Sequence, residues 1–165
     1  MNEFLARNLP PGYEFKNEVK AVSVSFAGGV IISLFGFFIE YSSARQFLYL
    51  QTGTVRILDE NAVMPDFVYI LGGKLNILLI LAGLAFVISS AIHYAYFHSG
   101  SKSFYLMLRL PHRFELHKRS MLIPLIYALM FLLAAAILLL VYYAAYMTKT
   151  PEPCLRPDQW RKIWQ

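Results

Sequence analysis

Residues 121–148 read MLIPLIYALMFLLAAAILLLVYYAAYMT, a stretch of 28 residues without a charged side chain. Two further uncharged stretches precede it, at Ala21–Ile39 (19 residues) and Leu75–Phe97 (23 residues). The hydrocarbon core of a bilayer is about 30 Å thick, and about 20 apolar residues in a helix cross it. A helix is favoured there because its backbone groups bond to one another where water is absent. The sequence therefore predicts three transmembrane helices, at about 21–41, 75–97 and 121–147.

The composition supports a membrane protein. Of the 165 residues, 58% are hydrophobic and 15% are charged, whereas a soluble domain is about 45–50% apolar and about 25% charged. A disordered chain is excluded by this hydrophobic fraction, and a disulfide scaffold by the single cysteine. Three buried helices of a soluble protein are the weaker alternative, because such helices are usually interrupted by charges. The predicted fold class is an all-α membrane protein: three transmembrane helices, a helical cytoplasmic connector and short interfacial helices in a single membrane domain, 1–165.

The distribution of basic residues predicts the orientation. The loop between the second and third spans, residues 98–120, holds five lysines and arginines against one glutamate. Because short basic loops stay in the cytoplasm, we expect a plasma-membrane protein with a cytoplasmic N-terminus. The 42–74 loop and the 148–165 tail are then outside. Four basic residues in that tail, Lys149, Arg156, Arg161 and Lys162, favour the opposite orientation.

The outer loop, residues 42–74, contains signals of local structure. Residues 47–50 and 55–58 have strand-like composition, which favours a small hairpin or a re-entrant cap. Residues 64–67 have the pattern of a helix start, and we expect Pro65 to pre-set the first turn.

Both ends of the chain contain segments suited to the membrane surface. Residues 13–20 mix acidic, basic and apolar side chains, so they form either a short interfacial helix that leads into the first span or a solvated arm. In the tail, Trp160, Ile163 and Trp164 share a helical face. This pattern predicts an interfacial helix of one or two turns, capped by Asp158.

Small residues recur at helical spacing on the first two spans. They are Ser25, Gly29, Ser33 and Gly36 on the first span, and Ala85, Ser89 and, on the same face, His93 on the second. Small side chains at a spacing of about four residues let helix backbones approach closely. These faces are predicted to pack helices, either against another subunit or among the three spans of this chain.

No arrangement of residues in the sequence is typical of a catalytic, metal or cofactor site. His93 and His98 are five residues apart, as are His112 and His117, which does not place both rings of a pair on one helical face. His93, inside the second span, is suited to a proton relay or a substrate contact, but we favour a hydrogen bond to a neighbouring helix. We expect a protein that is not an enzyme, with no metal, no cofactor and no nucleic-acid partner.

The cytoplasmic loop holds the most distinctive sequence, SFYLMLRLPHRFELHKR at residues 103–119. Residues 103–110 form one amphipathic segment, which Pro111 interrupts. A second helix can begin at that proline and run into the third span, with Glu115 and Arg119 as an i,i+4 pair in the favourable order. This connector, apolar and basic together, suits an anionic headgroup layer or a groove on a protein.

The connector resembles that of the membrane permease subunits of type-2 ABC exporters. Those permeases carry a Leu-Pro-x-x-Arg-x-Glu-hydrophobic sequence on a cytoplasmic helical connector between their second and third spans, which docks on the ATPase subunit. The matching residues here, which the resemblance implies bind a partner, are Tyr105, Arg109, Leu110, Pro111, Arg113, Glu115 and Leu116. Glu115 is one residue closer to the proline than in the usual pattern. Since those permeases commonly have six spans, the resemblance implies a half-size or accessory subunit.

The sequence thus predicts a non-catalytic membrane subunit of an ABC-type transport complex. Its expected partners are the lipid bilayer, an ABC ATPase and a further membrane subunit, with a homo-oligomer as another form of assembly. One alternative is a regulatory or assembly protein that recognises a partner through its 42–74 loop. A lipid-modifying enzyme that uses His93 and His98 is disfavoured, because the sequence lacks the clusters of acidic and metal-binding residues that such enzymes need.

Overall fold

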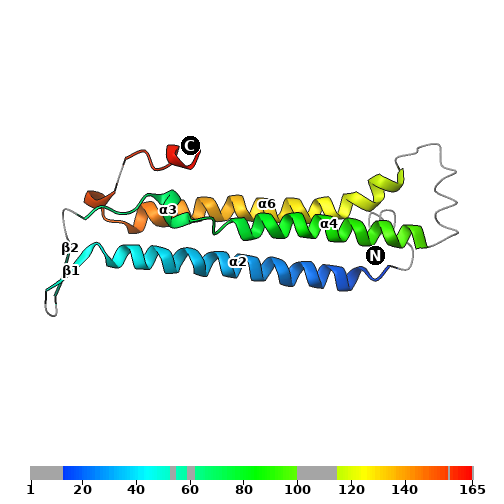
Figure 1. Ribbon diagram of the computed structural model, residues 1–165, viewed down its shortest axis with the longest axis horizontal. Coiled ribbons are helices and arrows are strands. Elements are labelled where there is room, and N and C mark those ends of the chain that lie inside the picture. The colour runs from blue at the N-terminus through cyan, green and yellow to red at the C-terminus, as the bar shows by residue number, and fades with distance from the viewer. Residues whose placement is uncertain (1–12, 53–54, 59–61, 100–114, 156, 165) are drawn as a thin grey trace. The chain divides into compact units, whose positions relative to one another are not determined.

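In the part of the chain that the structure describes, the fold is helical apart from one small β-hairpin (Figure 1). The computed structural model describes residues 13–52, 55–58, 62–99, 115–155 and 157–164. For some of these only the backbone is described, namely residues 50–52, 55–57, 97–99, 115–119 and 164. Three helices are long and apolar enough to cross a membrane. The predicted fold class, an all-α protein with three such helices, is therefore confirmed.

The three long helices are α2 (Phe15–Gln46), α4 (Asn76–Ser99) and α6 (Glu115–Lys149). The first begins earlier than the predicted span, because residues 15–20 contain no glycine or proline that would end a helix. Of the two alternatives predicted for residues 13–20, a short helix leading into the first span and a solvated arm, the structure has a helix. Phe15–Lys20 forms the first turns of α2.

The chain divides into two compact units. Unit 1 contains residues 1–29 and 78–134, which include the first part of α2, most of α4 and the first part of α6. Unit 2 contains residues 30–77 and 135–165, which include the rest of α2 and α6, the hairpin, α3 (Phe67–Leu71) and the tail.

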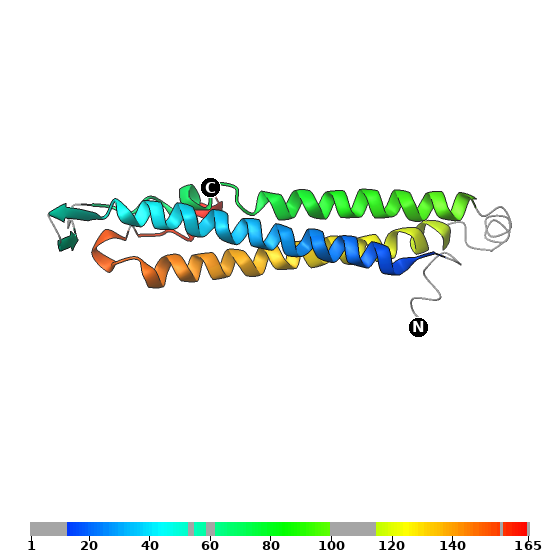
Figure 2. The ribbon, with the colours of Figure 1, turned by 90° about the horizontal axis from the view of Figure 1, so that it is seen from below.

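In unit 1 the beginning of α2 runs beside α4, as Figures 1 and 2 show in blue and green. Gly29 makes the close approach possible. A Cβ at this position would lie 2.7 Å from Cδ1 of Leu81 and 3.1 Å from Cδ2 of Leu78. Phe26 of α2 meets Phe131 of α6 edge to face, with ring centres 5.3 Å apart.

The core of unit 2 is aromatic. Phe37 of α2 stacks on Tyr142 of α6, with ring centres 4.2 Å apart and planes 8° apart. Phe67 of α3 meets Tyr143 and Tyr146 of α6 edge to face, each at 5.5 Å. These rings come from three helices, so a single cluster of side chains holds α3 against both long helices.

The outer loop begins with a hairpin, which confirms one of the two alternatives predicted for it. Strands β1 (Tyr49–Thr52) and β2 (Val55–Leu58) are antiparallel, with Tyr49 opposite Leu58 and Thr52 opposite Val55. The first strand begins two residues later than predicted, because α2 ends at Gln46 and a turn follows it.

The predicted helix of the outer loop is α3, which begins at Phe67 within the predicted start at residues 64–67, but Pro65 does not have the role predicted for it. Asp66 is the N-cap, so Pro65 lies before the helix and does not form its first turn. The carbonyl of Pro65 instead accepts a hydrogen bond from the Tyr146 hydroxyl at 2.9 Å. The helix ends at Gly72, whose φ of 45° is the left-handed conformation that glycine adopts most readily.

The tail forms two 3₁₀ turns, η1 (Glu152–Cys154) and η2 (Arg161–Trp164). The predicted segment thus contains a helix of one turn, but it is a 3₁₀ helix that begins at Arg161, three residues after the predicted cap Asp158. Asp158 has a φ of 59°, and this left-handed residue lies in the turn that precedes η2. Four residues are also too few for an α-helix to be stable by itself. Contacts with α3 and α6 therefore shape this segment.

Candidate functional site

A buried acidic residue lies at the beginning of the first transmembrane helix. Glu18 is in the first turn of α2, where the helix dipole favours a negative charge. Its side chain is only 7% exposed, whereas Lys16 and Lys20 are exposed. A carboxylate removed from water needs hydrogen-bond partners, since burial without them is costly. The neighbours of Glu18 on α4 supply those partners.

Ser89 and His93 of α4 face Glu18. They are four residues apart, so both side chains lie on one side of the helix. The Nε2 atom of His93 is 2.9 Å from Oε2 of Glu18, and the Ser89 hydroxyl donates a hydrogen bond to Oε1. The His93 side chain is completely buried. These contacts satisfy both oxygens of the carboxylate and join α2 to α4.

Two tyrosines lie close to Glu18 and His93. The ring of Tyr13, just before α2, meets His93 edge to face at 5.1 Å and Tyr96 at 5.3 Å. Burial raises the pKa of Tyr13, and the charge and hydrogen bonding of Glu18 raise it further. Tyr13 therefore keeps its proton and stays neutral beside the carboxylate.

Three buried polar atoms near these residues have no hydrogen-bond partner among the residues that the structure describes. They are Nδ1 of His93, the hydroxyl of Ser90 and the hydroxyl of Tyr127. Tyr127, on α6, also interacts electrostatically with Glu18 and Tyr13. We define the polar cluster as Tyr13, Glu18, Ser89, His93 and Tyr127. It brings all three long helices together within unit 1.

A groove between α2 and α4 leads to the polar cluster. Its volume is about 310 Å³, and Tyr13, Glu18 and Ser89 contribute to its lining. The other lining residues are aliphatic, apart from Ser25. The groove therefore combines a polar part with a longer apolar part.

The chemistry available to the cluster is hydrogen bonding and proton exchange. A carboxylate, an imidazole and three hydroxyl groups can each accept or donate a proton. Metal binding needs more ligands, and no group of three or more histidine, cysteine, aspartate or glutamate side chains gathers in the described ranges.

The residues of the predicted packing face on α2 lie in different surroundings. Ser25 is exposed at the groove, and Gly29 is buried against α4. In unit 2, Ser33 is buried and its hydroxyl bonds to that of Tyr142 at 2.8 Å. Gly36 faces Lys74, whose Cδ would lie 3.3 Å from an added Cβ.

On α4, the three residues of the predicted face point toward the beginning of α2. Ala85 lines the groove, and Ser89 and His93 bond to Glu18 as described above. For His93 the structure thus gives a hydrogen bond to a neighbouring helix. Its partner is an ionisable side chain, which the sequence interpretation did not include.

The predicted partner-binding residues mostly lie outside the described residues. This applies to Tyr105, Arg109, Leu110, Pro111 and Arg113. Glu115 and Leu116 form the first turn of α6, where only the backbone is described. His98 is likewise described only in its backbone, and His112 and His117 have no described side chains.

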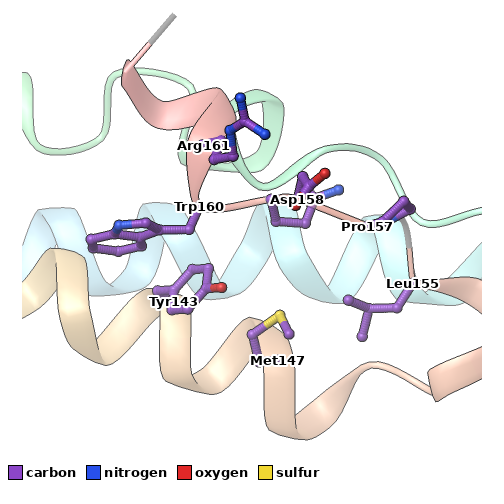
Figure 3. Close-up of a pocket in the computed structure, with 8 residues that line it drawn as sticks. Tyr143, Met147, Leu155, Pro157, Asp158, Trp160 and Arg161 are labelled. Carbon is purple, nitrogen blue, oxygen red and sulfur yellow. The ribbon is translucent and has the colours of Figure 1, made fainter.

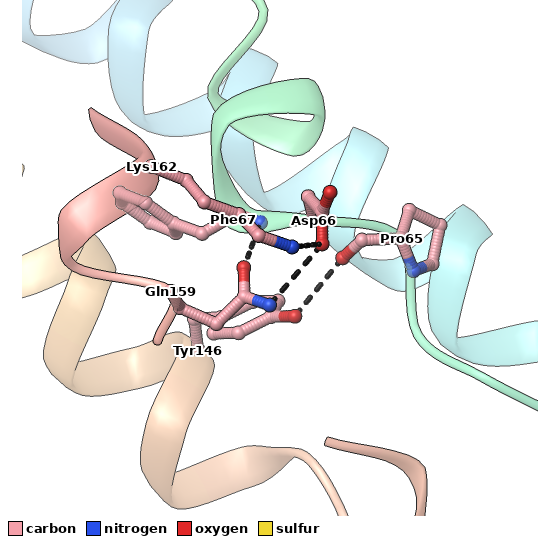
Figure 4. A network of polar contacts seen from close by, with 6 residues as sticks. All are labelled: Pro65, Asp66, Phe67, Tyr146, Gln159 and Lys162. Carbon is pink, nitrogen blue, oxygen red and sulfur yellow. Dashed lines mark hydrogen bonds and ion pairs between the residues drawn. The ribbon is translucent and has the colours of Figure 1, made fainter. Parts of the chain in front are cut away.

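A second polar network, in unit 2, holds the tail against α3 (Figure 4). The Phe67 N–H donates to Oε1 of Gln159 at 2.9 Å, and Nε2 of Gln159 donates to Oδ1 of Asp66 at 3.2 Å. Lys162 also contacts Oδ1 of Asp66, at 2.8 Å. The first N–H groups of a helix have no partner inside it. Here a glutamine from the tail supplies one for α3.

A cavity of about 450 Å³ lies between the tail and α6 (Figure 3). Trp160 meets Tyr143 edge to face at 4.9 Å on one side of it, and Met147 and Leu155 add apolar surface. Arg161 supplies a positive charge. The tryptophan predicted to lie on the membrane surface thus packs on this chain's own helix.

Sequence reasoning missed Glu18 because the first span was predicted to begin at Ala21. The missed signal is the unbroken helical pattern from Phe15 onward. It places Glu18 three residues before Ala21 and four residues before Val22, on the groove side of α2. An acid at this position, within a helix that enters the membrane, needs a partner on a neighbouring helix.

Comparisons of the chain with protein-family models, with curated proteins and with solved structures gave no match.

Proposed function

We propose that this multi-pass membrane protein is a non-catalytic subunit of an ABC-type transport complex, in which the connector of residues 103–119 binds an ATPase or permease partner. The structural observation that supports the proposal is the continuity of α6. This helix begins at Glu115, inside the connector, and continues without a break through the third membrane-crossing segment, Ser120–Lys149. A partner that moves the connector would therefore move the span directly.

The resemblance of the connector to that of type-2 ABC exporter permeases supplies the class of partner. Residues 98–120 hold five basic residues against one acidic residue, which suits an acidic groove on a cytoplasmic ATPase. We further propose that the N-terminus and this connector face the cytoplasm, and that the hairpin and the tail lie outside. Three helices offer little room for an aqueous path, so a further membrane subunit completes the complex.

Affinity purification in a mild detergent, followed by mass spectrometry, tests the proposal. The variant replaces both charged residues of the connector motif, Arg113→Ala and Glu115→Ala. The matched control replaces an exposed pair at the beginning of α2, Glu14→Ala and Lys16→Ala. Each variant removes one positive and one negative charge. We expect an ABC ATPase to co-purify with the wild type and the control, and to be lost from the connector variant while its helical content is kept.

Two results would contradict the proposal. One is purification of the wild type without an ATPase or a second membrane subunit. The other is a connector variant that retains the complete complex. The proposed orientation has its own test, which is the accessibility of tags at the two ends to protease in sealed cells. A protected C-terminal tag and an accessible N-terminal tag would reverse it.

A second function, recognition of a partner through the outer loop, is favoured by the surroundings of Phe47. This residue lies between α2 and the hairpin, and its side chain is 84% exposed. Since α3 is part of the core, with Phe67 and Ile70 buried, deletion should be limited to the hairpin, residues 49–58. Loss of the partner on this deletion, with the complex intact in the connector variant, would favour recognition over coupling.

A further inference from the structure

We propose that the groove between α2 and α4 binds one phospholipid with a primary ammonium headgroup, the chemistry of phosphatidylethanolamine. An acyl chain lies along the aliphatic part of the groove, and the ammonium group contacts Glu18. Such a site goes beyond the proposed transport role and is independent of it, because every residue that forms the site belongs to this chain.

The groove changes from polar to apolar along the two helices. At one end Glu18 bonds to Ser89, and at the other Leu81 packs on Gly29. Between these ends the lining is aliphatic apart from Ser25. A lipid has the same order along its length, since a polar head is followed by a hydrocarbon chain.

The polar end lies at the level of the membrane surface. The charged side chains of residues 14–20 directly precede the uncharged stretch Ala21–Ile39. Among them Lys16 and Lys20 are exposed, and long basic side chains at the end of a span extend to the headgroup layer. Glu18 lies between these lysines in the sequence, so it is close to that layer, and the aliphatic lining lies deeper. The groove and a lipid of this leaflet therefore run in the same direction.

The groove is accessible from the side of the helices that faces lipid. Leu84, Ile88 and Ile92 of α4 line it and are exposed, as are Ala21 and Ser25 of α2. Its volume of about 310 Å³ is at the lower end of the range of about 300–1,000 Å³ for small-molecule sites. A transmembrane helix is about 10 Å across with its side chains. A single acyl chain is much thinner and fits the groove better.

The acceptor at the polar end selects the headgroup. A carboxylate accepts about four hydrogen bonds, and among the described residues Ser89, His93 and Tyr13 account for three. The remaining position of Glu18 needs a donor, and an ammonium N–H forms the stronger, charge-assisted bond. The ring of Tyr13 also lines the groove, and aromatic faces attract ammonium groups.

Native mass spectrometry of the full chain, released from a mild detergent with added lipid, tests the site. Three lipids with identical acyl chains are compared: phosphatidylethanolamine, phosphatidylcholine, which has no N–H, and phosphatidylglycerol, which is anionic. We expect one phosphatidylethanolamine per chain, bound about ten-fold more tightly than either of the others, which is the effect of one hydrogen bond to a charged group. Equal retention of the three lipids would overturn the proposal.

Two pairs of variants separate the contribution of the chain from that of the headgroup. Ala21→Leu narrows the groove; its control is Ala27→Leu, at an exposed position of α2 outside the lining. Glu18→Gln removes the charge at the polar end; its control is Glu14→Gln, at an exposed acid one turn earlier. We expect Ala21→Leu to lose the lipid, Glu18→Gln to lose the preference for phosphatidylethanolamine, and both controls to bind as the wild type does. Equal binding by the two leucine variants, or an unchanged preference in Glu18→Gln, would contradict the site.

A second measurement needs no substitution and so applies even if a variant does not fold. Phosphatidylethanolamine with a photoactivatable acyl chain is added as a minor component of phosphatidylcholine nanodiscs, and the crosslinks are mapped by mass spectrometry. We expect them on Leu84 and Ile88 in the groove, and few on Leu129 and Leu133, which are exposed on α6. Equal labelling of both sets would mean that the lipid only surrounds the protein, which rules the site out. A dimer of the chain without retained lipid, abolished by Ala21→Leu, would show that a second copy fills the groove and would also rule it out.

Discussion

Ser33 of α2 and Tyr142 of α6 share a buried hydrogen bond, with their hydroxyl oxygens 2.8 Å apart. Phe37, one helical turn after Ser33, stacks on the same tyrosine ring at 4.2 Å. One side chain of α6 therefore makes a polar and an apolar contact with one face of α2. The two contacts differ in strength. A hydrogen bond between membrane helices averages about 0.6 kcal/mol, and removing a buried aromatic ring costs about 3–5 kcal/mol.

The first prediction separates these two contacts. Tyr142→Phe keeps the stacked ring and removes the hydroxyl, so the free energy of unfolding should fall by about 1 kcal/mol or less. Tyr142→Ala removes both and should lower it by about 3–5 kcal/mol. Unfolding by a denaturing detergent, followed by circular dichroism, measures both. Equal losses for the two variants would show that the hydrogen bond, and not the ring, is the main contribution.

The second prediction compares two adjacent glycines of α2. A Cβ on Gly28 would meet nothing within 4 Å, whereas one on Gly29 would lie 2.7 Å from Leu81. Both alanine variants gain about 1 kcal/mol of helix propensity, so the difference between them isolates the crowding. We expect Gly29→Ala to be about 1–3 kcal/mol less stable than Gly28→Ala in the same detergent assay. Leucine at each position should widen this gap. Equal stability of the two leucine variants would contradict the close contact with α4.

The long helices were predictable because they depend on local properties of the sequence. Uncharged stretches of sufficient length give the three spans, and strand-like composition gives the hairpin. The tail was not predictable in the same way. Trp160 and Trp164 have the spacing of an interfacial helix, but the bonds of Gln159 to Phe67 and Asp66 shape the segment differently. Those partners are distant in the sequence, so no local pattern reveals them.

The polar cluster was half predictable. His93 and Ser89 were identified as members of one face of α4, because their spacing follows from helix geometry. Glu18 was not, since its role depends on which side of α2 faces α4 and on where the helix begins. The pairing of residues on different spans is a tertiary property, and a hydrophobic pattern does not fix it.

The third prediction concerns the ionisation of Tyr13. Burial, and then Glu18, raises its pKa above the usual value of about 10. A raised pKa means that this tyrosine stabilises the fold at every pH below about 10, and that the contribution is lost as the pH rises through the higher, folded value. The difference in tyrosinate absorbance between wild type and Tyr13→Phe should therefore stay near zero around pH 10. If the wild type instead shows more tyrosinate absorbance than Tyr13→Phe at about pH 10, Tyr13 is not held beside the carboxylate.

The role of Glu18 in this shift can be checked separately. Glu18→Gln removes the negative charge and leaves the ring packed against His93 and Tyr96. Tyr13 should then ionise at a lower pH than in the wild type, although still above the usual value because burial is the larger cause. An unchanged titration would mean that burial alone accounts for the shift.

The last prediction uses the single cysteine as a probe of the tail. Cys154 is 1% exposed, and its carbonyl accepts a hydrogen bond from the Met64 N–H at 3.0 Å. Gln159 holds the next part of the tail to the same segment, through Phe67. Gln159→Ala would leave the buried Phe67 N–H without its acceptor, which costs about 1–3 kcal/mol. This cost applies to the docked tail, so the tail should open more often and maleimide should label Cys154 roughly ten-fold faster.

Arg161→Ala is the matched control, because Arg161 is an exposed neighbour in the same tail. Its replacement should leave the rate of labelling near that of the wild type. Lys162→Ala should lie between the two, since its ion pair with Asp66 is about one-third exposed on both sides and is partly screened by solvent. Fast labelling in the wild type, or equal rates in Gln159→Ala and Arg161→Ala, would show that Gln159 does not hold the tail. The expected order, with the glutamine variant fastest, would show that a buried glutamine from the tail fixes the beginning of α3.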